Sequence, residues 1–454
     1  MNKKSTLDSL SVRKRYWTTP VETLTPVKRE FHSMNLCRNI EAKKCLAIHG
    51  IYRKQPPRCM TRLCRTVACV MLAGLCTSYL LAQQSVGSNV GSSAKELTTP
   101  ERSKYVGDSE ESGPLAKDLS PSLNRADVDH AMRKIADWQL LRVQEHWSQD
   151  WTFAAMYTGF MAAGDSLHEA RYRNAMLAMS EGFDWRLGPR LTHADDQAIG
   201  QTYLALYRKE RDPKRIAAVR TQFDQIMQLP DDPAKPVWWW CDALFMAPPV
   251  WTRLSYATGE KKYLDYMDRE WWITSKLLFD PQEHLYFRDA TYFDKREKNG
   301  KKIFWSRGNG WVMAGLARVL EGMPADYPSR AKYVEQFRQL ATRVAELQGS
   351  DGLWRPGLLD AGDYPLPEVS GSAFFVYAMA WGINHHVLDR AKYEPVVARA
   401  WAGLISHIYA DGRLGCIQPI GAAPGDFQPA SSYVYGIGAF LLAGSEVRLL
   451  KARP

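Results

Sequence analysis

The residue with the clearest chemical potential is an aspartate that follows three consecutive tryptophans. The stretch Val237-Trp-Trp-Trp240-Cys-Asp242 runs directly into the apolar segment Ala243-Leu-Phe-Met-Ala247. Apolar neighbours disfavour the charged form of a carboxyl group, so Asp242 is a candidate general acid that holds a proton near neutral pH. Tryptophan faces also stack on the apolar C–H faces of sugar rings. The structural alternative is that the tryptophans fill a core and Asp242 caps the following helix.

Two adjacent acids, Asp195 and Asp196, stand at the start of another predicted helix, within Thr192-His-Ala-Asp-Asp-Gln-Ala-Ile-Gly200. The helix dipole and the free backbone N–H groups favour carboxylates there, so capping accounts for at least one of them. The other acid would face a cleft, position water or tune Asp242, and we expect this to be Asp196. Neither His193 nor the pair His385-His386 has convergent ligand spacing, so no metal site is expected.

A third constellation joins a cation to aromatic residues in Phe304-Trp-Ser-Arg307-Gly-Asn-Gly-Trp311. Arg307 and Trp311 are four residues apart and would share a helix face. A guanidinium beside an indole suits a sugar that bears a carboxylate, because the guanidinium can pair with the carboxylate while the indole stacks on the sugar ring. The structural alternative for this pair is a cation–π brace.

A polar loop, Pro365-Leu-Pro-Glu368-Val-Ser370-Gly371-Ser372, precedes a further apolar helix. Glu368 and Ser370 are candidates for polar groups that line a cleft, and Ser372 suits a helix cap. The segment Gly371-Ser372-Ala373 is not a nucleophile elbow, because no strand precedes it and the spacing differs.

The positive charge of the chain lies in its first part. The 454 residues carry a net charge of +10, but residues 1–59 alone hold thirteen Lys/Arg and four Asp/Glu, and residues 83–454 hold 44 basic and 45 acidic side chains. The main argument for a nucleic-acid partner, the positive charge of the whole chain, therefore does not apply to residues 83–454. Residues 60–82 combine a basic start, an apolar run and small residues near Ala82, which is typical of a secretory signal peptide.

This arrangement predicts an exported protein, periplasmic or extracellular, whose translation starts at Met60, with 1–59 as a start-site artefact. Alternatives are a membrane anchor or a lipoprotein at Cys76; no stable membrane insertion is expected after cleavage. Six of the eight cysteines lie before residue 83. The remaining Cys241 and Cys416 form no disulfide framework or zinc motif, and we expect two buried free thiols rather than a bridge.

The rest of the chain divides into a linker and a helical domain. Residues 83–125 are rich in Ser, Gly, Lys and Glu, which predicts a flexible linker. Residues 126–454 show apolar residues at helical spacing in twelve segments, and only Leu285–Asp289 suggests a hairpin strand. The segments are Val128–Glu145, Thr152–Gly164, Glu169–Phe183, Ala198–Arg208, Pro213–Leu229, Asp242–Thr258, Lys261–Phe279, Asn309–Glu321, Arg330–Leu347, Ser372–Trp381, Tyr393–Ile408 and Ser432–Leu450.

A loose internal repeat, in which an Asp-containing loop follows a helix, suggests how the helices are arranged. It recurs at Asp280, Asp351-Gly352 and Asp411-Gly412. Twelve helices with such loops can alternate between an inner and an outer ring, which gives an all-α (α/α)6 barrel with the loops of one end gathered at a cleft. A solenoid that does not close is the alternative.

Together these motifs resemble glycoside hydrolase family 105, the unsaturated rhamnogalacturonyl hydrolases, and more distantly the unsaturated glucuronyl hydrolases of family 88. The resemblance covers roughly residues 130–450, and its most specific parts are Trp240–Ala247 and Trp305–Trp311. It implies an (α/α)6 barrel, in agreement with the helix pattern.

The resemblance also implies roles for individual residues. Asp242 matches the catalytic acid/base, and Asp195 or Asp196 matches the second carboxylate. Substrate contacts are implied or expected at Trp240, Arg307, Trp311, Tyr157, His193, Arg288 and Glu368. Many members carry a histidine shortly after the segment that corresponds to Leu285–Phe287, whereas this chain has Arg288-Asp289, which bears on the leaving-side sugar or the substrate charge.

The implied reaction is hydration of the C4=C5 double bond that pectin lyases leave on a terminal uronic acid. Asp242 would protonate C4, water would add at C5, and the resulting hemiketal would open and release the glycosidic bond. Arg307 would hold the uronate carboxylate of the oligosaccharide, and no cofactor is required. Alternatives are an ordinary inverting glycosidase, a polysaccharide lyase on a helical toroid, and a glycan-binding toroid without catalysis.

Overall fold

The computed structural model of the protein describes residues 107, 112–230, 232 and 235–451. The leader (1–59) and the signal peptide (60–82) lie outside these residues, so both stay predictions. Within the proposed linker, the described stretch 112–124 is tied to the helical domain: Leu115 forms an antiparallel bridge with Tyr409, and the Ala116 N–H donates to the Ile408 carbonyl at 2.8 Å. Fixed structure therefore begins before residue 125, where the flexible linker was expected to end.

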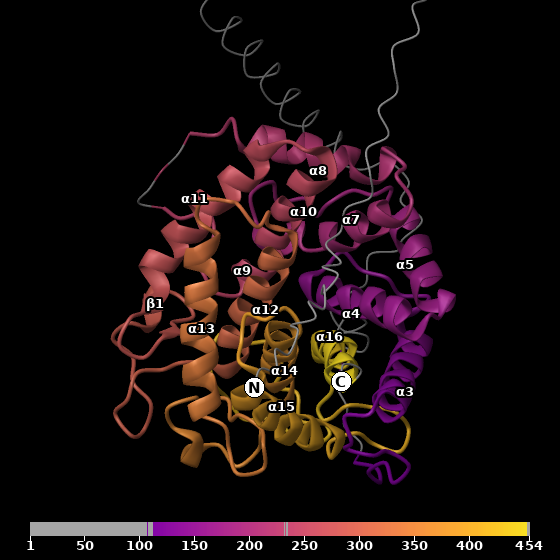
Figure 1. Ribbon diagram of the computed structural model, residues 1–454, viewed down its shortest axis with the longest axis vertical. Helices are drawn as coiled ribbons and strands as arrows, with labels where there is room; N and C mark the ends of the chain where they lie inside the picture. Colours follow the sequence, from indigo (N-terminus) through magenta and orange to yellow (C-terminus); the bar gives the residue numbers. More distant parts are fainter. Residues whose placement is uncertain (1–106, 108–111, 231, 233–234, 452–454) are drawn as a thin grey trace, which may run out of the picture. The chain divides into compact units, whose positions relative to one another are not determined.

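All twelve predicted helices are present in the described residues, and they alternate between two layers (Figure 1). The outer helices are α3 (Arg125–Val143), α5 (Ala170–Gly182), α8 (Lys214–Ile226), α11 (Lys261–Leu278), α13 (Arg330–Glu346) and α15 (Arg390–Ile405). The inner helices are α4 (Trp151–Leu167), α7 (Gly200–Lys209), α10 (Pro248–Thr258), α12 (Ser306–Gly322), α14 (Val369–Asn384) and α16 (Val434–Leu450).

The two layers differ in how their residues are distributed. The inner helix α14 is apolar all round, and every residue from Val369 to Asn384 is buried. The outer helix α13 buries a stripe that includes Tyr333, Phe337 and Leu340, while most of its charged residues face solvent. A helix without a polar face must be covered on all sides, whereas an amphipathic helix needs one neighbour layer, so the sequences of α14 and α13 fit their inner and outer positions. None of the described helices is long and apolar enough to cross a membrane.

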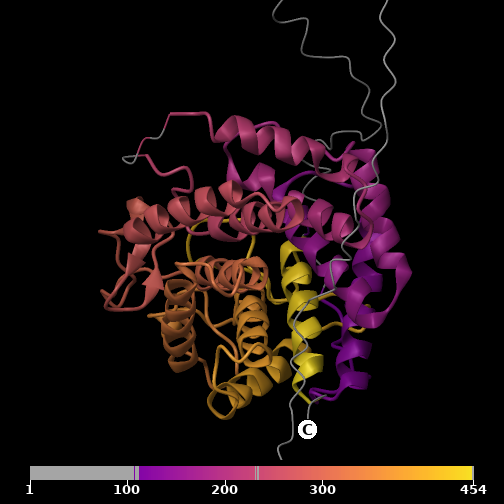
Figure 2. The ribbon, with the colours of Figure 1, turned by 45° about the horizontal axis from the view of Figure 1, so that its top comes forward.

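The inner helices form a closed ring. Each contacts the next in chain order, and the last, α16, packs against the first, α4. Figure 1 shows α16 between α14 and α4, and Figure 2 shows the yellow α16 beside the purple helices that begin the described chain. Closure excludes the open solenoid and confirms the predicted (α/α)6 barrel.

The seam between α4 and α16 depends on two glycines that face each other. A Cβ added at Gly159 of α4 would lie 2.7 Å from the Cα of Gly438 in α16, and a Cβ on Gly438 would meet the backbone of Ala155 and Met156. Real Cβ atoms do not approach backbone so closely, so only glycine permits this contact. The ring therefore closes by direct contact of the two backbones.

Short elements complete the loops at the N-terminal ends of the inner helices. Single turns α6 (Ala194–Gln197) and α9 (Ala243–Met246) precede α7 and α10, and two 3-10 turns lie at Ala290–Tyr292 and Ala361–Asp363. The predicted hairpin strand is β2 (Leu285–Tyr286), which pairs antiparallel with β1 (Phe279–Asp280), Phe279 opposite Tyr286. In the repeated loops, Asp351 and Asp411 accept backbone N–H groups and the following glycines have positive φ.

We expect Gly438→Ala to destabilise the protein by about 2–4 kcal/mol, because the new methyl group must push two inner helices apart. Urea denaturation followed by circular dichroism measures this loss. Gly182→Ala is the matched control, since a Cβ at the end of α5 meets nothing within 4 Å, and we expect a change within about 0.5 kcal/mol or a slight gain. Equal stability of the Gly438→Ala and wild-type proteins would contradict the proposed role of the seam.

Candidate active site

The two candidate acids come together because two single-turn helices pack against each other. Asp195 lies in α6, Asp242 directly precedes α9, and α6 contacts α9. The turn α6 leads into the inner helix α7, and the turn α9 leads into the inner helix α10. The barrel thus places two carboxyl groups from separate parts of the chain at one end.

Asp242 is largely enclosed, and its side chain makes no capping hydrogen bond to α9. Its carboxyl is 13% exposed; the Arg288 Nε atom lies 3.7 Å from Oδ2, and the Cys241 thiol donates to the same oxygen at 3.5 Å. Burial raises the pKa of Asp242, and the positive charges of Arg288 and Arg307 oppose that rise only in part. The capping alternative for this residue is therefore wrong, and the carboxyl is available for proton transfer.

Asp195 is the acid that faces Asp242. Its side chain is 18% exposed, and burial together with the charge of Asp242 raises its pKa to about 7. The Nδ1 atom of His193 lies 3.7 Å from Asp195 Oδ2, and burial and the nearby Arg190 lower the pKa of that histidine. Two carboxyls in one poorly solvated site resist losing both protons, so the pair retains a proton near neutral pH.

Asp196 has a structural role, which corrects the expectation that it faces the cleft. Its Oδ2 accepts the Arg190 backbone N–H at 2.7 Å, and its Oδ1 accepts the Arg190 Nε at 3.0 Å. Its carboxyl group also fills the space beside Gly188, where a Cβ would lie 2.6 Å from Asp196 Cγ. Asp196 thus fixes the loop before α6, and the choice between the two acids falls on Asp195.

The three tryptophans separate into core and surface. Trp238 and Trp240 are buried, whereas Trp239 is 48% exposed. The Trp240 ring lies 4.8 Å from the His193 ring and 4.7 Å from the Trp239 ring. Trp240 therefore forms a wall beside the acids, as the sequence predicts, and Trp239 offers an aromatic face to solvent.

Arg288 is a cation that lies beside Asp242. Its side chain is 21% exposed, its Nη1 donates to Asp289 Oδ2 at 2.6 Å, and its guanidinium carbon lies 5.4 Å from the centre of the Trp239 ring. Its Nε makes no hydrogen bond to any described residue. A half-satisfied guanidinium beside two acids and an exposed indole can receive an anionic group of a ligand.

Arg307 does not reach the cleft, which corrects its predicted role as the uronate-binding residue. Its side chain is fully buried and donates to the carbonyl oxygens of Gln418 and Pro419, both at 2.7 Å. Its guanidinium carbon lies 4.3 Å from the Trp305 ring centre and 4.9 Å from that of Tyr435. Arg307 is thus a cation–π brace, and its aromatic partners are Trp305 and Tyr435 rather than Trp311.

Three further predicted contact residues are buried. Glu368 caps α14 by accepting the N–H groups of Ser370 and Gly371, and it lies 4.0 Å from Arg307. Trp311 packs against Phe374 with a ring separation of 4.2 Å. Tyr157 donates its hydroxyl hydrogen to the Ser148 carbonyl at 2.8 Å. Hydrogen bonding and core packing account for the positions of all three side chains.

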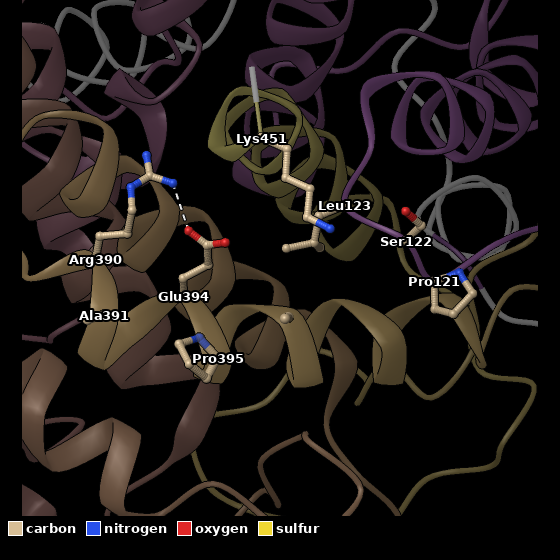
Figure 3. Close-up of a pocket in the computed structure, with 9 residues that line it drawn as sticks. Pro121, Ser122, Leu123, Arg390, Ala391, Glu394, Pro395 and Lys451 are labelled. Carbon is tan, nitrogen blue, oxygen red and sulfur yellow. Dashed lines mark hydrogen bonds and ion pairs between the residues drawn. The ribbon is translucent and has the colours of Figure 1, made fainter. Parts of the chain in front are cut away.

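Two hollows differ in their relation to this site. One, of about 390 Å³, lies beside the acids and includes His193, Trp239 and Trp240 in its lining. The other, of about 560 Å³, lies at the opposite end, between α15 and the C-terminal end of α16 (Figure 3). It contains the Arg390–Glu394 ion pair but neither candidate acid. Of these two hollows, only the first is lined by residues that adjoin the candidate acids.

Two further observations concern groups that can bind metals or form disulfides. Within the described part of the chain, no group of three His, Cys, Asp or Glu side chains is arranged to hold a metal ion. Cys241 and Cys416 are both buried and free, as predicted. Sequence reasoning missed Arg190, Gln418 and the thiol contact of Cys241, because only the fold brings the first two to their partners.

We expect Asp195→Asn to remove a pH-dependent loss of stability. A raised pKa means that the folded state binds a proton more tightly than the unfolded chain, so the unfolding free energy of the wild type falls as pH rises from about 4 to about 7. In the variant this decline shrinks by about 1–3 kcal/mol. Denaturation midpoints across this pH range measure it; the exposed Asp184→Asn is the control, and parallel curves for wild type and Asp195→Asn would refute it.

We expect Arg307→Met to cost about 2–4 kcal/mol of stability, because two carbonyl groups lose a donor and Glu368 loses a nearby positive charge. Chemical denaturation measures this loss. Arg186→Met is the control, since Arg186 forms only an exposed ion pair with Asp184 and should change stability by less than about 0.5 kcal/mol. A fully stable Arg307→Met protein would show that the brace is dispensable.

Two curated relatives share most of the chain. The first, from Formosa agariphila, is named an unsaturated 3S-rhamnoglycuronyl hydrolase; it is 39% identical over 72% of this chain and 92% of its own length. The second, from an Alteromonas species, has the same name and is 30% identical over 82% of this chain and 98% of its own length.

Solved structures give a consistent result. A protein named a polysaccharide lyase superposes with a TM-score of 0.69 at 35% identity, over 73% of this chain and 99% of that chain. A glycosyl hydrolase family 88 protein from Bacteroides vulgatus gives a TM-score of 0.69 at 30% identity, over 72% and 99%. The family model of Glycosyl Hydrolase Family 88 matches residues 125–451. The expected relationship to the unsaturated uronyl hydrolases is thereby confirmed: the chain belongs to Glycosyl Hydrolase Family 88.

Proposed function

We propose that the protein removes the unsaturated uronic acid from the non-reducing end of oligosaccharides that polysaccharide lyases release. The observation that carries this proposal is the pair Asp195–Asp242, two poorly solvated carboxyls with raised pKa values beside the cation Arg288. A proton held near neutral pH is what an enol ether needs for protonation at carbon. Family membership and the names of the two relatives support the same reaction.

In the proposed reaction, the proton of Asp242 is transferred to C4 of the C4=C5 double bond. The positive charge that forms is shared by C5 and the ring oxygen. Water adds at C5 and gives up a proton to the Asp242 carboxylate, which restores the acid. The resulting hemiketal opens, and the bond to the next sugar is lost. Asp195 assists by keeping the proton shared within the pair when substrate is bound.

Arg288 takes the place that the sequence assigned to Arg307, as the residue that binds the uronate carboxylate. The Arg288 side chain is 21% exposed, whereas the Arg307 side chain is fully buried and both of its Nη groups donate to backbone carbonyls. A carboxylate held at Arg288 would lie near Asp242, because Arg288 Nε is 3.7 Å from Asp242 Oδ2. The anion would also disfavour loss of the proton from Asp242, which keeps the acid ready.

The substrate proposed first is an unsaturated uronate linked to rhamnose, because both relatives are named rhamnoglycuronyl hydrolases. The pectin-derived rhamnogalacturonan oligosaccharides expected from the sequence rank second. Export to the periplasm or the outside, where polysaccharide lyases release such fragments, remains part of the proposal and depends on residues 60–82.

The proposal is tested by the ultraviolet absorbance of the unsaturated sugar. The wild type should abolish this absorbance with an unsaturated uronyl-rhamnose disaccharide, tested with and without a sulfate on the rhamnose, and with the rhamnogalacturonan counterpart. Asp242→Asn should lower kcat by about a thousandfold or more, because it cannot donate the proton. Asp184→Asn, at an exposed site, is the control.

The sign of the absorbance change separates this function from a lyase, the activity named for one similar structure. A lyase creates the double bond and raises the absorbance of an intact polysaccharide, whereas the proposed hydrolase consumes it. Binding without any change in absorbance would instead indicate a glycan-binding protein, and retained activity in Asp242→Asn would exclude the proposed acid.

We expect Arg288→Ala to raise KM by about tenfold to a hundredfold, because the substrate loses a charge-assisted contact. Arg288→Lys should recover part of the loss, because the lysine ammonium keeps the positive charge but lacks the two parallel donors of the guanidinium. Steady-state kinetics on the disaccharide measures both. Arg390→Ala, at the opposite end of the barrel (Figure 3), is the control. An unchanged KM in Arg288→Ala would rule out this assignment.

A further inference from the structure

A buried amide side chain, that of Gln201, connects the two parts of the chain that carry the acids. Gln201 lies in the first turn of the inner helix α7, and its Nε2 donates to the carbonyl oxygen of Phe245 in α9 at 2.8 Å. We propose that Gln201, held in place by Arg318, is a positioning residue that fixes the separation of Asp195 and Asp242. This inference rests on the proposed function, because the separation matters only if the two acids act together.

The sequence leaves two carbonyl groups of α9 without a donor from their own helix. The Phe245 carbonyl would accept the N–H of residue 249, but Pro249 has no N–H. The Met246 carbonyl also lacks its usual partner, because the Val250 N–H donates to the carbonyl of the next residue instead, at 2.8 Å. Buried carbonyl groups need a donor, and Gln201 Nε2 serves both, at 2.8 Å and 3.4 Å.

Backbone hydrogen bonds connect this side-chain contact to each acid. On one side, the Gln201 N–H donates to the Ala198 carbonyl at 3.1 Å, and the Ala198 N–H donates to the Asp195 carbonyl at 3.2 Å. On the other side, the Phe245 N–H donates to the Asp242 carbonyl at 3.0 Å. The hydrogen bond from Gln201 to Phe245 therefore completes a continuous connection between the two acids, and a shift of α9 against α7 would change their separation.

Arg318, on the inner helix α12, determines which way the Gln201 amide points. Its Nε donates to Gln201 Oε1 at 2.6 Å, and both side chains are buried, with exposed fractions of 6% and 1%. A guanidinium offers only donors, so the amide oxygen must face Arg318 and the amide nitrogen must face the carbonyls of α9. Burial lowers the pKa of Arg318 to about 10, which still leaves it charged at neutral pH.

A second buried amide holds the two helix pairs together independently of Gln201. The Trp251 Nε1 atom on α10 donates to Gln197 Oε1 in α6 at 2.9 Å, and both side chains are buried. Loss of the bond from Gln201 should therefore move α9 locally and leave the helix pairs in contact. A substitution of Gln201 thus tests the position of the acid more than the integrity of the barrel.

Steady-state kinetics on the unsaturated disaccharide tests the positioning role. Gln201→Met removes the donor to Phe245 with a side chain of similar size, and we expect kcat to fall by about tenfold or more. The KM should stay within about twofold, because the proposed uronate contact, Arg288, lies outside α9. Gln201→Glu should lose as much kcat, although its carboxylate can still accept from Arg318 and should keep the denaturation midpoint close to that of the wild type.

The matched control is Gln336→Met. Gln336 is also a buried amide, 5% exposed, and its Oε1 accepts the Trp271 Nε1 hydrogen at 3.0 Å between the outer helices α11 and α13. This variant should lower the denaturation midpoint but leave kcat within about twofold of the wild type. Unchanged kcat in both Gln201 variants, or a kcat loss of the same size in Gln336→Met, would overturn the positioning role.

Variants of Arg318 keep the inference testable if the Gln201 variants do not fold. Arg318→Met leaves the amide of Gln201 free to reverse, and kcat should fall by about tenfold. Arg318→Lys keeps a charged group that only donates, so it should retain most of the kcat. Unchanged kcat in Arg318→Met, or equal losses in the two variants, would overturn the role of Arg318. Failure of the proposed function is distinct, because the wild type itself would then leave the double bond intact.

Discussion

The contact between Gly159 and Gly438 is the constraint on which the closed ring of inner helices depends. It lets α16 rest on α4 backbone to backbone, and this contact turns a row of helix pairs into a ring. The single turns before the inner helices α7 and α10 contact each other at one end of this ring. An open array would spread the same loops along an edge. Asp195 and Asp242 come from neighbouring helix pairs and meet because α6 contacts α9, and closure of the ring adds the loops of the other pairs to the same end.

The shared space suits the two acids for proton transfer, but burying them there also lowers the stability of the fold. Burial alone disfavours an ionised carboxyl, and a second carboxyl nearby adds repulsion, so one proton stays on the pair at neutral pH. Arg288 limits the cost by lying close to Asp242, and Arg307 contributes its charge from a fixed position deeper in the protein. The structure thus gives two arginines different positions. Arg288 lies where a ligand is proposed to bind, and Arg307 is buried as part of the framework.

The sequence predicted the helices well and the site only in part. Apolar spacing identified all twelve helices, because each of them buries at least one apolar face. The acid motifs were found because their residue types are unusual next to tryptophan or to each other. The choice between Asp195 and Asp196, however, depends on Arg190 in the preceding loop, and the fate of Arg307 depends on the carbonyls of Gln418 and Pro419, more than a hundred residues away. Neither partner follows from local spacing.

The run of three tryptophans shows how one stretch can serve both the core and the substrate. Trp240 pairs with Asp289 in an antiparallel bridge, which holds this part of the chain extended. In an extended chain, neighbouring side chains point to opposite sides. With Trp238 and Trp240 buried, Trp239 is turned outward, next to Arg288. The core packing of two indoles therefore fixes the exposed face of the third, so that the aromatic surface beside Arg288 is already in place in the free protein.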